Sequence, residues 1–177
     1  ELGRVAVVVG YGSLPRVAAV EPAACPTLTN APLAHDCRDM APLAPLVKKH
    51  TLGRPFLPPG FHSRCLRYHG MAPMVSPCQK PGLPRARSYH QLETFAAGLG
   101  FAQAEGILPA PEANHAVIGA QREAERCREE GRSETILFNL CGHGNFDMQA
   151  YHDYHAGKLH DYEYPDEEIA MALAGLP

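Results

Sequence analysis

The chain has 177 residues, of which 45% are hydrophobic and 20% are charged, and its formal net charge is -3 at pH 7. This composition is typical of a globular protein, and the lack of a basic surplus gives no reason to expect a nucleic-acid partner. No apolar run reaches the ~20 residues of a membrane-spanning helix, so we expect no membrane association. The six cysteines form no Cys-x-x-Cys pair, which favours reduced thiols in a cytoplasmic protein.

Two short β-branched runs open the chain. Residues 4–9 end in a Gly-Tyr-Gly-Ser turn, and residues 16–20 end at Glu21-Pro22. Both runs are typical of buried strands in a parallel sheet, but a parallel crossover needs a dozen or more residues, usually with a helix. Only about six residues join these runs. Either the two strands are antiparallel, or a segment that normally lies between them is missing.

The opening, ELGRVAVVVG, lacks the cationic head and cleavage site of a signal peptide, and it begins almost inside a strand. This favours a piece of a longer protein. Residues 22–86 are rich in Pro and Gly, so we expect a loop-rich region. If another part of a larger protein normally covers these loops, their apolar side chains should be exposed here and favour association: Leu43, Leu46, Phe56, Leu57, Phe61 and Leu66.

Residues 88–177 are predicted to form a helix–strand–helix core. Ser88 is expected to cap a helix that runs to about residue 104, and residues 112–130 are expected to form a second helix. Residues 135–140 give the strongest strand prediction of the chain.

Two further helices are expected at residues 146–156 and 166–176, the second capped by Asp166. Alternation of strands and helices indicates an α/β fold. We expect residues 1–177 to be a single segment rather than separate domains.

Two glycine-rich turns follow predicted strands. Cys141-Gly142-His143-Gly144 comes directly after 135–140, and Gly10-Tyr11-Gly12-Ser13 comes after the first run. In α/β sheets, ligands bind beyond the carboxyl ends of the strands, and glycine lets the backbone approach a ligand closely. The two turns therefore mark a candidate binding site.

Seven segments, in chain order, resemble the C-terminal part of a tryptophan synthase beta chain, and more narrowly its second, TrpB-like type. They are AVEPAACPTLT (19–29), KKHTLG (48–53), LRYHGMAP (66–73), SYHQLETF (88–95), EGILPAPEANHA (105–116), TILFNLCGHGNFDM (135–148) and DYEYP (161–165). The resemblance implies a partial type II pyridoxal-phosphate-dependent fold, with a parallel sheet, flanking helices and an absent N-terminal half. It also implies a lyase that joins L-serine and indole into L-tryptophan. In its full-length form such a protein would be a homodimer, with a tryptophan synthase alpha chain as a candidate partner.

By this resemblance, Cys141 stands where the family has a serine that faces the pyridine nitrogen of pyridoxal 5'-phosphate, and a thiol is likewise neutral. Glu112 matches a glutamate near the cofactor ring, and Gly142 and Gly144 would pass the backbone beside that ring. The residue types alone leave open a buried structural cysteine, and a carboxylate that stabilises a helix N-terminus.

Gly10, Gly12 and Ser13 resemble the tail of the family's Gly-Gly-Gly-Ser-Asn loop, which binds the cofactor phosphate through backbone N–H groups. Tyr11 and Leu14 depart from that pattern. The helix that should follow the loop is also absent, which favours a truncated, spliced or degenerated gene.

Arg67 and Tyr68 match the family's segment over the indole site, so we expect both to contact substrate. The first type of beta chain has an aspartate in place of Arg67, which favours the second type. Backbone carbonyls near Tyr68 and Gly70 are candidate ligands of a monovalent cation.

The Schiff-base lysine of the family has no counterpart, because the chain contains no His-Lys-x-Asn motif. We expect Lys48, Lys49, Lys80 and Lys158 to be surface lysines. With no catalytic residue of this kind, the chain should be inactive alone. The alternatives are a non-catalytic remnant that binds a partner, or another β-replacement or β-elimination on an amino acid.

A metal protein is a rival interpretation, because histidines and aspartates crowd the C-terminal region. No metal-binding signature is matched, so we expect no metal site. The residues concerned are His143, His152, His155, His160, Asp147 and Asp153.

Overall fold

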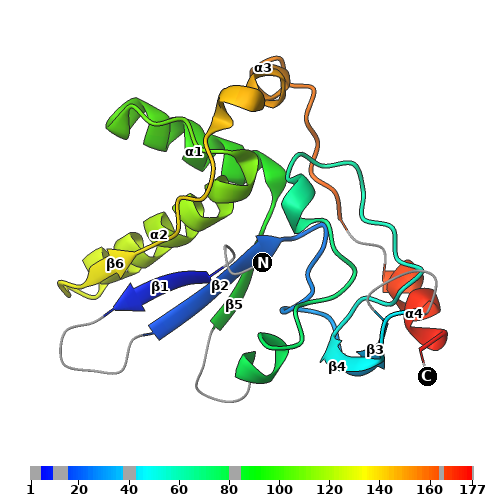
Figure 1. Ribbon diagram of the computed structural model, residues 1–177. Coiled ribbons are helices and arrows are strands. Elements are labelled where there is room, and N and C mark those ends of the chain that lie inside the picture. The colour runs from blue at the N-terminus through cyan, green and yellow to red at the C-terminus, as the bar shows by residue number, and fades with distance from the viewer. Residues whose placement is uncertain (1–4, 10–15, 38–42, 80–84, 164–165, 177) are drawn as a thin grey trace.

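The computed structural model describes residues 5–9, 16–37, 43–79, 85–163 and 166–176, and these form an α/β fold (Figure 1). The strands are β1 (Val5–Val9), β2 (Arg16–Pro22), β3 (Leu33–Asp36), β4 (Val47–His50), β5 (Arg85–Tyr89) and β6 (Thr135–Leu137). The helices are α1 (Gln91–Glu105), α2 (Pro111–Glu129), α3 (Met148–His155) and α4 (Asp166–Ala174), with 3-10 turns η2 (Arg64–Leu66), η3 (Ser76–Gln79) and η4 (Gly144–Phe146).

The larger sheet has the strand order β5-β2-β1-β6. Strands β2 and β5 are parallel, but β1 is antiparallel to both β2 and β6. The expectation of a parallel sheet is therefore correct for one pair only. The physical reason is the short connection between β1 and β2, which has no room for a crossover helix and so leaves the antiparallel arrangement.

Strand β5 was not expected, because its sequence, Arg-Ala-Arg-Ser-Tyr, is polar and shows no apolar alternation. Ser88 belongs to this strand, so its expected role as a helix cap is wrong. The N-cap of α1 is His90, whose backbone N–H donates to Oε1 of Glu93 at 2.7 Å. The helix ends at Gly106, which adopts a left-handed conformation with φ 71°.

Helix α2 packs on β1, β2 and β6, and α1 packs against α2 (Figure 1). Val20, Ala97, Val117 and Ile118 form the core of this contact. The two helices approach so closely that a Cβ at Gly98 would lie 2.0 Å from Oδ1 of Asn114. Glycine in the middle of α1 therefore has a packing reason, despite its low helix propensity.

Helix α3 is anchored on α1 by aromatic rings. The ring of Phe95 lies 5.0 Å from that of Tyr151 and 5.5 Å from that of Tyr154. The helix expected at 146–156 begins later, at Met148, because η4 precedes it. The strand expected at 135–140 is likewise shorter, and Asp166 lies in the first turn of α4 rather than before it.

The loop-rich region contains its own small core. The antiparallel pair β3–β4 lies near helix α4 (Figure 1), and Ala172 of α4 packs with Leu52, Phe56 and Phe61. The expected exposure is wrong for Phe56, Phe61 and Leu66, which are buried because α4 and the neighbouring loops cover them. It is correct for Leu43, Leu46 and Leu57.

Buried ionisable side chains organise this region and the turn that leads into it. Lys49 is only 4% exposed, so its expected place on the surface is wrong. Its Nζ lies 2.9 Å from the carbonyl of Cys37 and 3.5 Å from Oδ2 of Asp36, and this carboxylate compensates the buried charge. Lys48 and Lys158 are exposed, as expected, and Lys80 lies outside the described residues.

Glu21 is a further buried ionisable side chain, at 1% exposure. Its carboxylate accepts hydrogen bonds from the backbone N–H groups of Leu28 and Thr29 and from the hydroxyls of Thr27 and Thr29, at 2.7–3.1 Å. The side chain thereby fixes the turn that follows β2. Burial raises the pKa of Glu21, and these hydrogen bonds oppose that rise.

Among the described helices, none has both the length and the apolar character needed to cross a lipid bilayer.

Candidate functional site

The turn after β6 pairs with the segment that enters α2. The N–H of Ala110 donates to the carbonyl of Gly142 at 3.1 Å, and the N–H of Gly144 donates to the carbonyl of Leu108 at 2.7 Å. These bonds flank an antiparallel bridge between Pro109 and His143. The carboxyl end of β6 is thereby placed beside the N-terminus of α2.

Both glycines of this turn are required by the chain's own backbone. Gly142 has φ 100°, a conformation that L side chains rarely adopt, and a Cβ there would lie 3.1 Å from the Cβ of Ala110. A Cβ at Gly144 would lie 2.5 Å from the carbonyl oxygen of Pro109. The glycines therefore let the turn backbone approach residues 108–110 closely.

Glu112 joins this turn to the loop-rich region. It is half-buried in the first turn of α2, and its Oε1 accepts a hydrogen bond from the N–H of Cys65 at 3.2 Å. A carboxylate there also stabilises the helix N-terminus, so the simpler interpretation of Glu112 holds as well. We name this region the Glu112 mouth, and it comprises His62, Cys65, Glu112, Cys141–His143 and Asp147.

The charged groups of the Glu112 mouth act on one another. The pKa of Asp147 is raised, mainly by burial and further by the carboxylate of Glu112, while His62 and His143 oppose the rise. These four side chains come from three separate stretches of the chain. His62 and Cys65 carry no sequence signal for this role, because only tertiary contacts bring them here.

Cys141 is a solvent-exposed thiol at this mouth. The alternative of a buried structural cysteine is therefore wrong.

Arg67 and Tyr68 follow Cys65 after one intervening residue, and the side chain of Arg67 is held by its own loop. Nη2 of Arg67 donates to the carbonyl of Pro58 at 2.9 Å, and its guanidinium lies 5.9 Å from the ring centre of Phe61. The Tyr68 side chain is 44% exposed.

The backbone carbonyls of residues 68 and 69, near the expected site of a monovalent cation, accept hydrogen bonds from within the protein. The carbonyl of Tyr68 accepts from the thiol of Cys25 at 2.7 Å. The carbonyl of His69 accepts from the N–H of Leu52 at 2.6 Å and from the Thr51 hydroxyl at 3.2 Å. These contacts use the carbonyl of His69 twice, and a cation at the carbonyls near Tyr68 and Gly70 stays a prediction.

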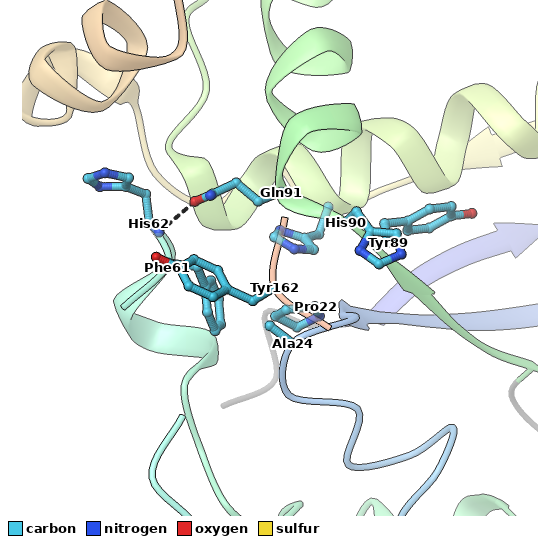
Figure 2. A pocket seen from close by; sticks show the side chains of 9 residues that line it. Pro22, Ala24, Phe61, His62, Tyr89, His90, Gln91 and Tyr162 are labelled. Carbon is cyan, nitrogen blue, oxygen red and sulfur yellow. Dashed lines mark hydrogen bonds between the residues drawn. The ribbon is translucent and has the colours of Figure 1, made fainter. Parts of the chain in front are cut away.

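A small cavity lies where β2 and β5 end and α1 begins (Figure 2). Its volume of about 10 Å³ suits one water molecule at most. The dashed line in Figure 2 marks the hydrogen bond from the N–H of His62 to Oε1 of Gln91, at 2.9 Å. Figure 2 also shows Tyr162 beside Phe61. Side chains thus close the carboxyl ends of the parallel pair.

The segment 160–162 contributes to this closure from the C-terminal side. Nε2 of Gln91 donates to the carbonyl of His160 at 2.7 Å, and the N–H of Leu92 donates to Oδ1 of Asp161 at 2.9 Å. At the end of β6, by contrast, residues 141–143 of the Glu112 mouth are exposed.

The remaining predicted site residues, Gly10, Gly12 and Ser13, lie outside the described residues. Within the described part of the chain, no three or more His, Cys, Asp or Glu side chains gather as a metal site would require.

Comparison with known proteins gives a consistent result. No protein-family model matches the chain. Over 152 residues it is 51% identical to tryptophan synthase beta chain 2 of Aeropyrum pernix, which covers 86% of this chain and 34% of the relative. The protein of the same name from Thermotoga maritima is 50% identical over 136 residues, covering 77% of this chain and 32% of the relative. The protein of that name from Aquifex aeolicus is 49% identical over 146 residues, which cover 82% of this chain and 34% of the relative.

The chain thus spans about one third of the length of the curated relatives that it matches. The seven resembling segments and this level of identity agree, and the chain belongs to the tryptophan synthase beta chain family.

Proposed function

We propose that these residues form the C-terminal part of a pyridoxal-phosphate-dependent lyase with the type II fold. In its full-length form the protein joins L-serine and indole into L-tryptophan. The name that the relatives carry supports the activity, and the seven matching segments support the position in the chain. Another β-replacement or β-elimination on an amino acid uses the same groups and is the alternative within this family.

The observation that carries the proposal is the pairing of residues 108–110 with the turn after β6. It brings the exposed thiol of Cys141, the backbone at Gly142 and the carboxylate of Glu112 to one mouth. Such a set suits one side of a flat heteroaromatic cofactor, because a neutral thiol can face a ring nitrogen without forcing its protonation. When bound, the cofactor supplies an electron sink for the amino-acid substrate.

Asp147 of the mouth and the neighbouring Arg67 support this site. Asp147 holds a proton more readily than an ordinary aspartic acid, because of its burial and the neighbouring Glu112 carboxylate. Arg67 fixes the loop that carries Tyr68 through its bond to Pro58. In this proposal Gly10, Gly12 and Ser13 bind the cofactor phosphate, and Arg67 and Tyr68 border the indole.

The lysine that the cofactor needs comes from the part of the relatives that these residues do not span. We propose that the 177 residues alone do not form tryptophan, because Lys48 and Lys158 are exposed and Lys49 is held in a buried ion pair. The full-length protein is proposed to be a cytoplasmic homodimer that pairs with a tryptophan synthase alpha chain. Backbone carbonyls near Tyr68 and Gly70 are the proposed ligands of a monovalent cation, because a carbonyl oxygen has two lone pairs.

A chimera tests the proposal. The matched segment of the Aeropyrum pernix relative is replaced by the corresponding residues of this chain, with Cys141, Cys141→Ser or Cys141→Asp. The serine variant should form tryptophan at a rate within about threefold of the cysteine form and keep its cofactor absorbance spectrum, because both groups are neutral. The aspartate variant should be slower by at least about tenfold and show a changed spectrum, because a carboxylate favours a protonated ring nitrogen.

Equal rates and spectra for all three chimeras would show that Cys141 does not face the ring. Tryptophan formation by the 177-residue chain alone would overturn the proposed dependence on an absent lysine. In that case each lysine would be replaced in turn to find the one that acts.

One observation favours a second candidate, a non-catalytic remnant that binds a partner. Strands β1 and β2 are antiparallel, whereas a strand–loop–helix phosphate site requires a crossover helix between parallel strands. A remnant should show no change in the absorbance of added pyridoxal phosphate, in the chain or in the chimera. A saturable change in the chimera would exclude it.

A further inference from the structure

A buried hydroxyl joins α2, α3 and the segment that leads into α2. Oη of Tyr151, on α3, donates to the carbonyl oxygen of Pro109 at 2.6 Å. Nδ2 of Asn114, on α2, donates to the same Oη at 3.0 Å. Tyr151 is 3% exposed and Asn114 is 0% exposed, so bulk water does not reach these bonds.

The direction of the two bonds follows from the single proton of the hydroxyl. Oδ1 of Asn114 also lies 3.1 Å from Oη, but the bond to Pro109 is shorter and takes the proton. The amide of Asn114 therefore presents its N–H to Tyr151. Burial, and to a smaller extent the charges of Asp147 and Glu112, raises the pKa of Tyr151 to about 12, so the hydroxyl keeps its proton at neutral pH.

The carbonyl of Pro109 is available to Tyr151 because the neighbouring bridge to His143 does not use it. The two hydrogen bonds that flank this bridge involve residues 108, 110, 142 and 144. Pro109 is fully buried, and a buried carbonyl needs a donor. The Tyr151 hydroxyl thus fixes the orientation of the peptide group at the centre of the pairing.

Two glycines leave room for this network. A Cβ at Gly98 of α1 would lie 2.0 Å from Oδ1 of Asn114, and a Cβ at Gly144 would lie 3.0 Å from Cε2 of Tyr151. Helix α1 and the turn after β6 therefore fit closely around the same two side chains. The network reaches both this turn and the helix whose first turn carries Glu112.

We propose that the Tyr151 hydroxyl and the Asn114 amide are positioning groups for the cofactor site. Acting through the carbonyl of Pro109, they hold the 141–144 turn and the Glu112 carboxylate in the mutual arrangement that a flat ring requires. Neither group touches the cofactor. The inference rests on the proposed function, because the ring in question is that of pyridoxal phosphate.

Packing alone does not require a polar network here. The ring of Tyr151 lies 5.0 Å from that of Phe95, and a phenylalanine at 151 would make the same contact. The hydroxyl and the amide add direction, because a hydrogen bond weakens steeply when its atoms are misplaced. A binding site needs supporting groups of this kind to hold the residues that contact the ligand.

Amide hydrogen exchange in the 177-residue chain tests the positioning. Tyr151→Phe removes the hydroxyl and keeps the ring. Exchange of the N–H groups of Ala110 and Gly144 should become faster by at least about tenfold, because their hydrogen bonds across the bridge are no longer held in register. Exchange at residues 117–118, in the core of α2, should stay within about twofold of the parent.

Tyr154→Phe is the matched control. Tyr154 is also on α3 and its ring also packs on Phe95, but its hydroxyl makes no hydrogen bond to another described residue. This variant should exchange like the parent at residues 110 and 144. Circular dichroism and the melting temperature verify that the variants fold.

Asn114→Leu is a second variant, which removes the amide that donates to Tyr151. It should also speed exchange at residues 110 and 144. The double variant, Tyr151→Phe with Asn114→Leu, should exchange no faster than the faster single variant, because both changes act on one network.

The chimera with the Aeropyrum pernix relative tests the link to the cofactor. Tyr151→Phe should weaken the binding of pyridoxal phosphate by at least about tenfold in an absorbance titration, because the groups that border the ring are no longer preorganised. Tyr154→Phe should bind it like the parent chimera.

Unchanged exchange at residues 110 and 144 in Tyr151→Phe, or equal exchange in Tyr151→Phe and Tyr154→Phe, would overturn the inference whatever reaction the protein performs. Faster exchange with an unchanged cofactor affinity would also overturn it, because the network would then be purely structural. A parent chimera that does not bind pyridoxal phosphate would overturn the proposed function and, with it, the cofactor role of the network. The exchange result in the 177-residue chain distinguishes that case from a network that does not hold the turn.

Discussion

Glu112 and Cys65 are 47 positions apart in the chain, and the carboxylate of the first accepts the backbone N–H of the second at 3.2 Å. This hydrogen bond joins the N-terminus of α2 to the loop that carries Arg67 and Tyr68. The family resemblance assigns Glu112 to the cofactor, and Arg67 and Tyr68 to the substrate. The hydrogen bond from Cys65 to Glu112 links these two groups, and the sequence does not predict it.

Replacement of Glu112 by glutamine should lower the pKa of Asp147 toward its ordinary value. The negative charge of Glu112 raises the pKa of Asp147, in addition to the larger effect of burial. Glutamine removes that charge. A pH titration of the Asp147 carboxyl signal by NMR measures the change. Glu129→Gln, on the exposed end of α2, should leave the titration unchanged, and an unshifted Asp147 in Glu112→Gln would contradict the proposed coupling.

Glu21→Gln should change how stability depends on pH. Because burial raises the pKa of Glu21 in the folded state above the ordinary value of 4.5, the folded state binds its proton more tightly than the unfolded state does. The stabilisation by protonated Glu21 is complete below the ordinary pKa, and it is lost as the pH rises through the folded value. The free energy of unfolding of the parent, minus that of the variant, should therefore fall as the pH rises above about 4.5.

Urea unfolding at several pH values measures this difference. A difference that is constant with pH, or that grows as the pH rises, would show that the hydrogen bonds from Thr27, Leu28 and Thr29 outweigh burial.

Lys49→Met should lower the free energy of unfolding by about 1–3 kcal/mol, because the buried carboxylate of Asp36 loses its lysine and keeps only the Thr51 hydroxyl and the His69 ring as partners. Lys48→Met, at the exposed neighbouring position, should change it by less than about 0.5 kcal/mol. The double variant Lys49→Met, Asp36→Asn should recover part of the loss, since no buried charge then remains unpaired. Chemical denaturation of the four proteins provides the test, and equal effects at 48 and 49 would refute the buried ion pair.

Two glycines of α1 should respond oppositely to alanine. Gly98→Ala should destabilise the protein by about 1–3 kcal/mol, because its Cβ would lie 2.0 Å from Oδ1 of Asn114 and push α1 from α2. Gly100→Ala meets no atom within 4 Å, so it should stabilise the helix by about 0.5–1 kcal/mol. Melting temperatures by circular dichroism measure both changes. A stabilising Gly98→Ala would mean that the two helices are not in close contact.

Periodicity predicts the two long helices well, because α1 and α2 carry apolar side chains at helical spacing. Strand β5 escapes prediction because its five residues, Arg-Ala-Arg-Ser-Tyr, have no apolar alternation, and parallel pairing with β2 forms it. The burial of Lys49 could not be predicted, since it depends on Asp36 and on the carbonyl of Cys37, which the β3–β4 pair brings near.

In the candidate site, too, some residues are predictable from the sequence and others are not. Cys141 and Glu112 were predicted from glycine spacing and family resemblance, and the structure brings their segments together. His62 and Cys65 carry no such pattern, and tertiary packing alone places them at the mouth. The turn at Gly10–Ser13 lies outside the described residues, so its predicted role in phosphate binding stays a prediction.

The hydrogen bonds from Gln91 and Leu92 to residues 160 and 161 have a practical consequence for protein engineering. Truncation before residue 158 would deprive the first turn of α1 of these acceptors and uncover Phe61 beside the ends of β2 and β5. Affinity tags and fluorescent fusions are therefore better attached after residue 177, with the preceding tail kept whole.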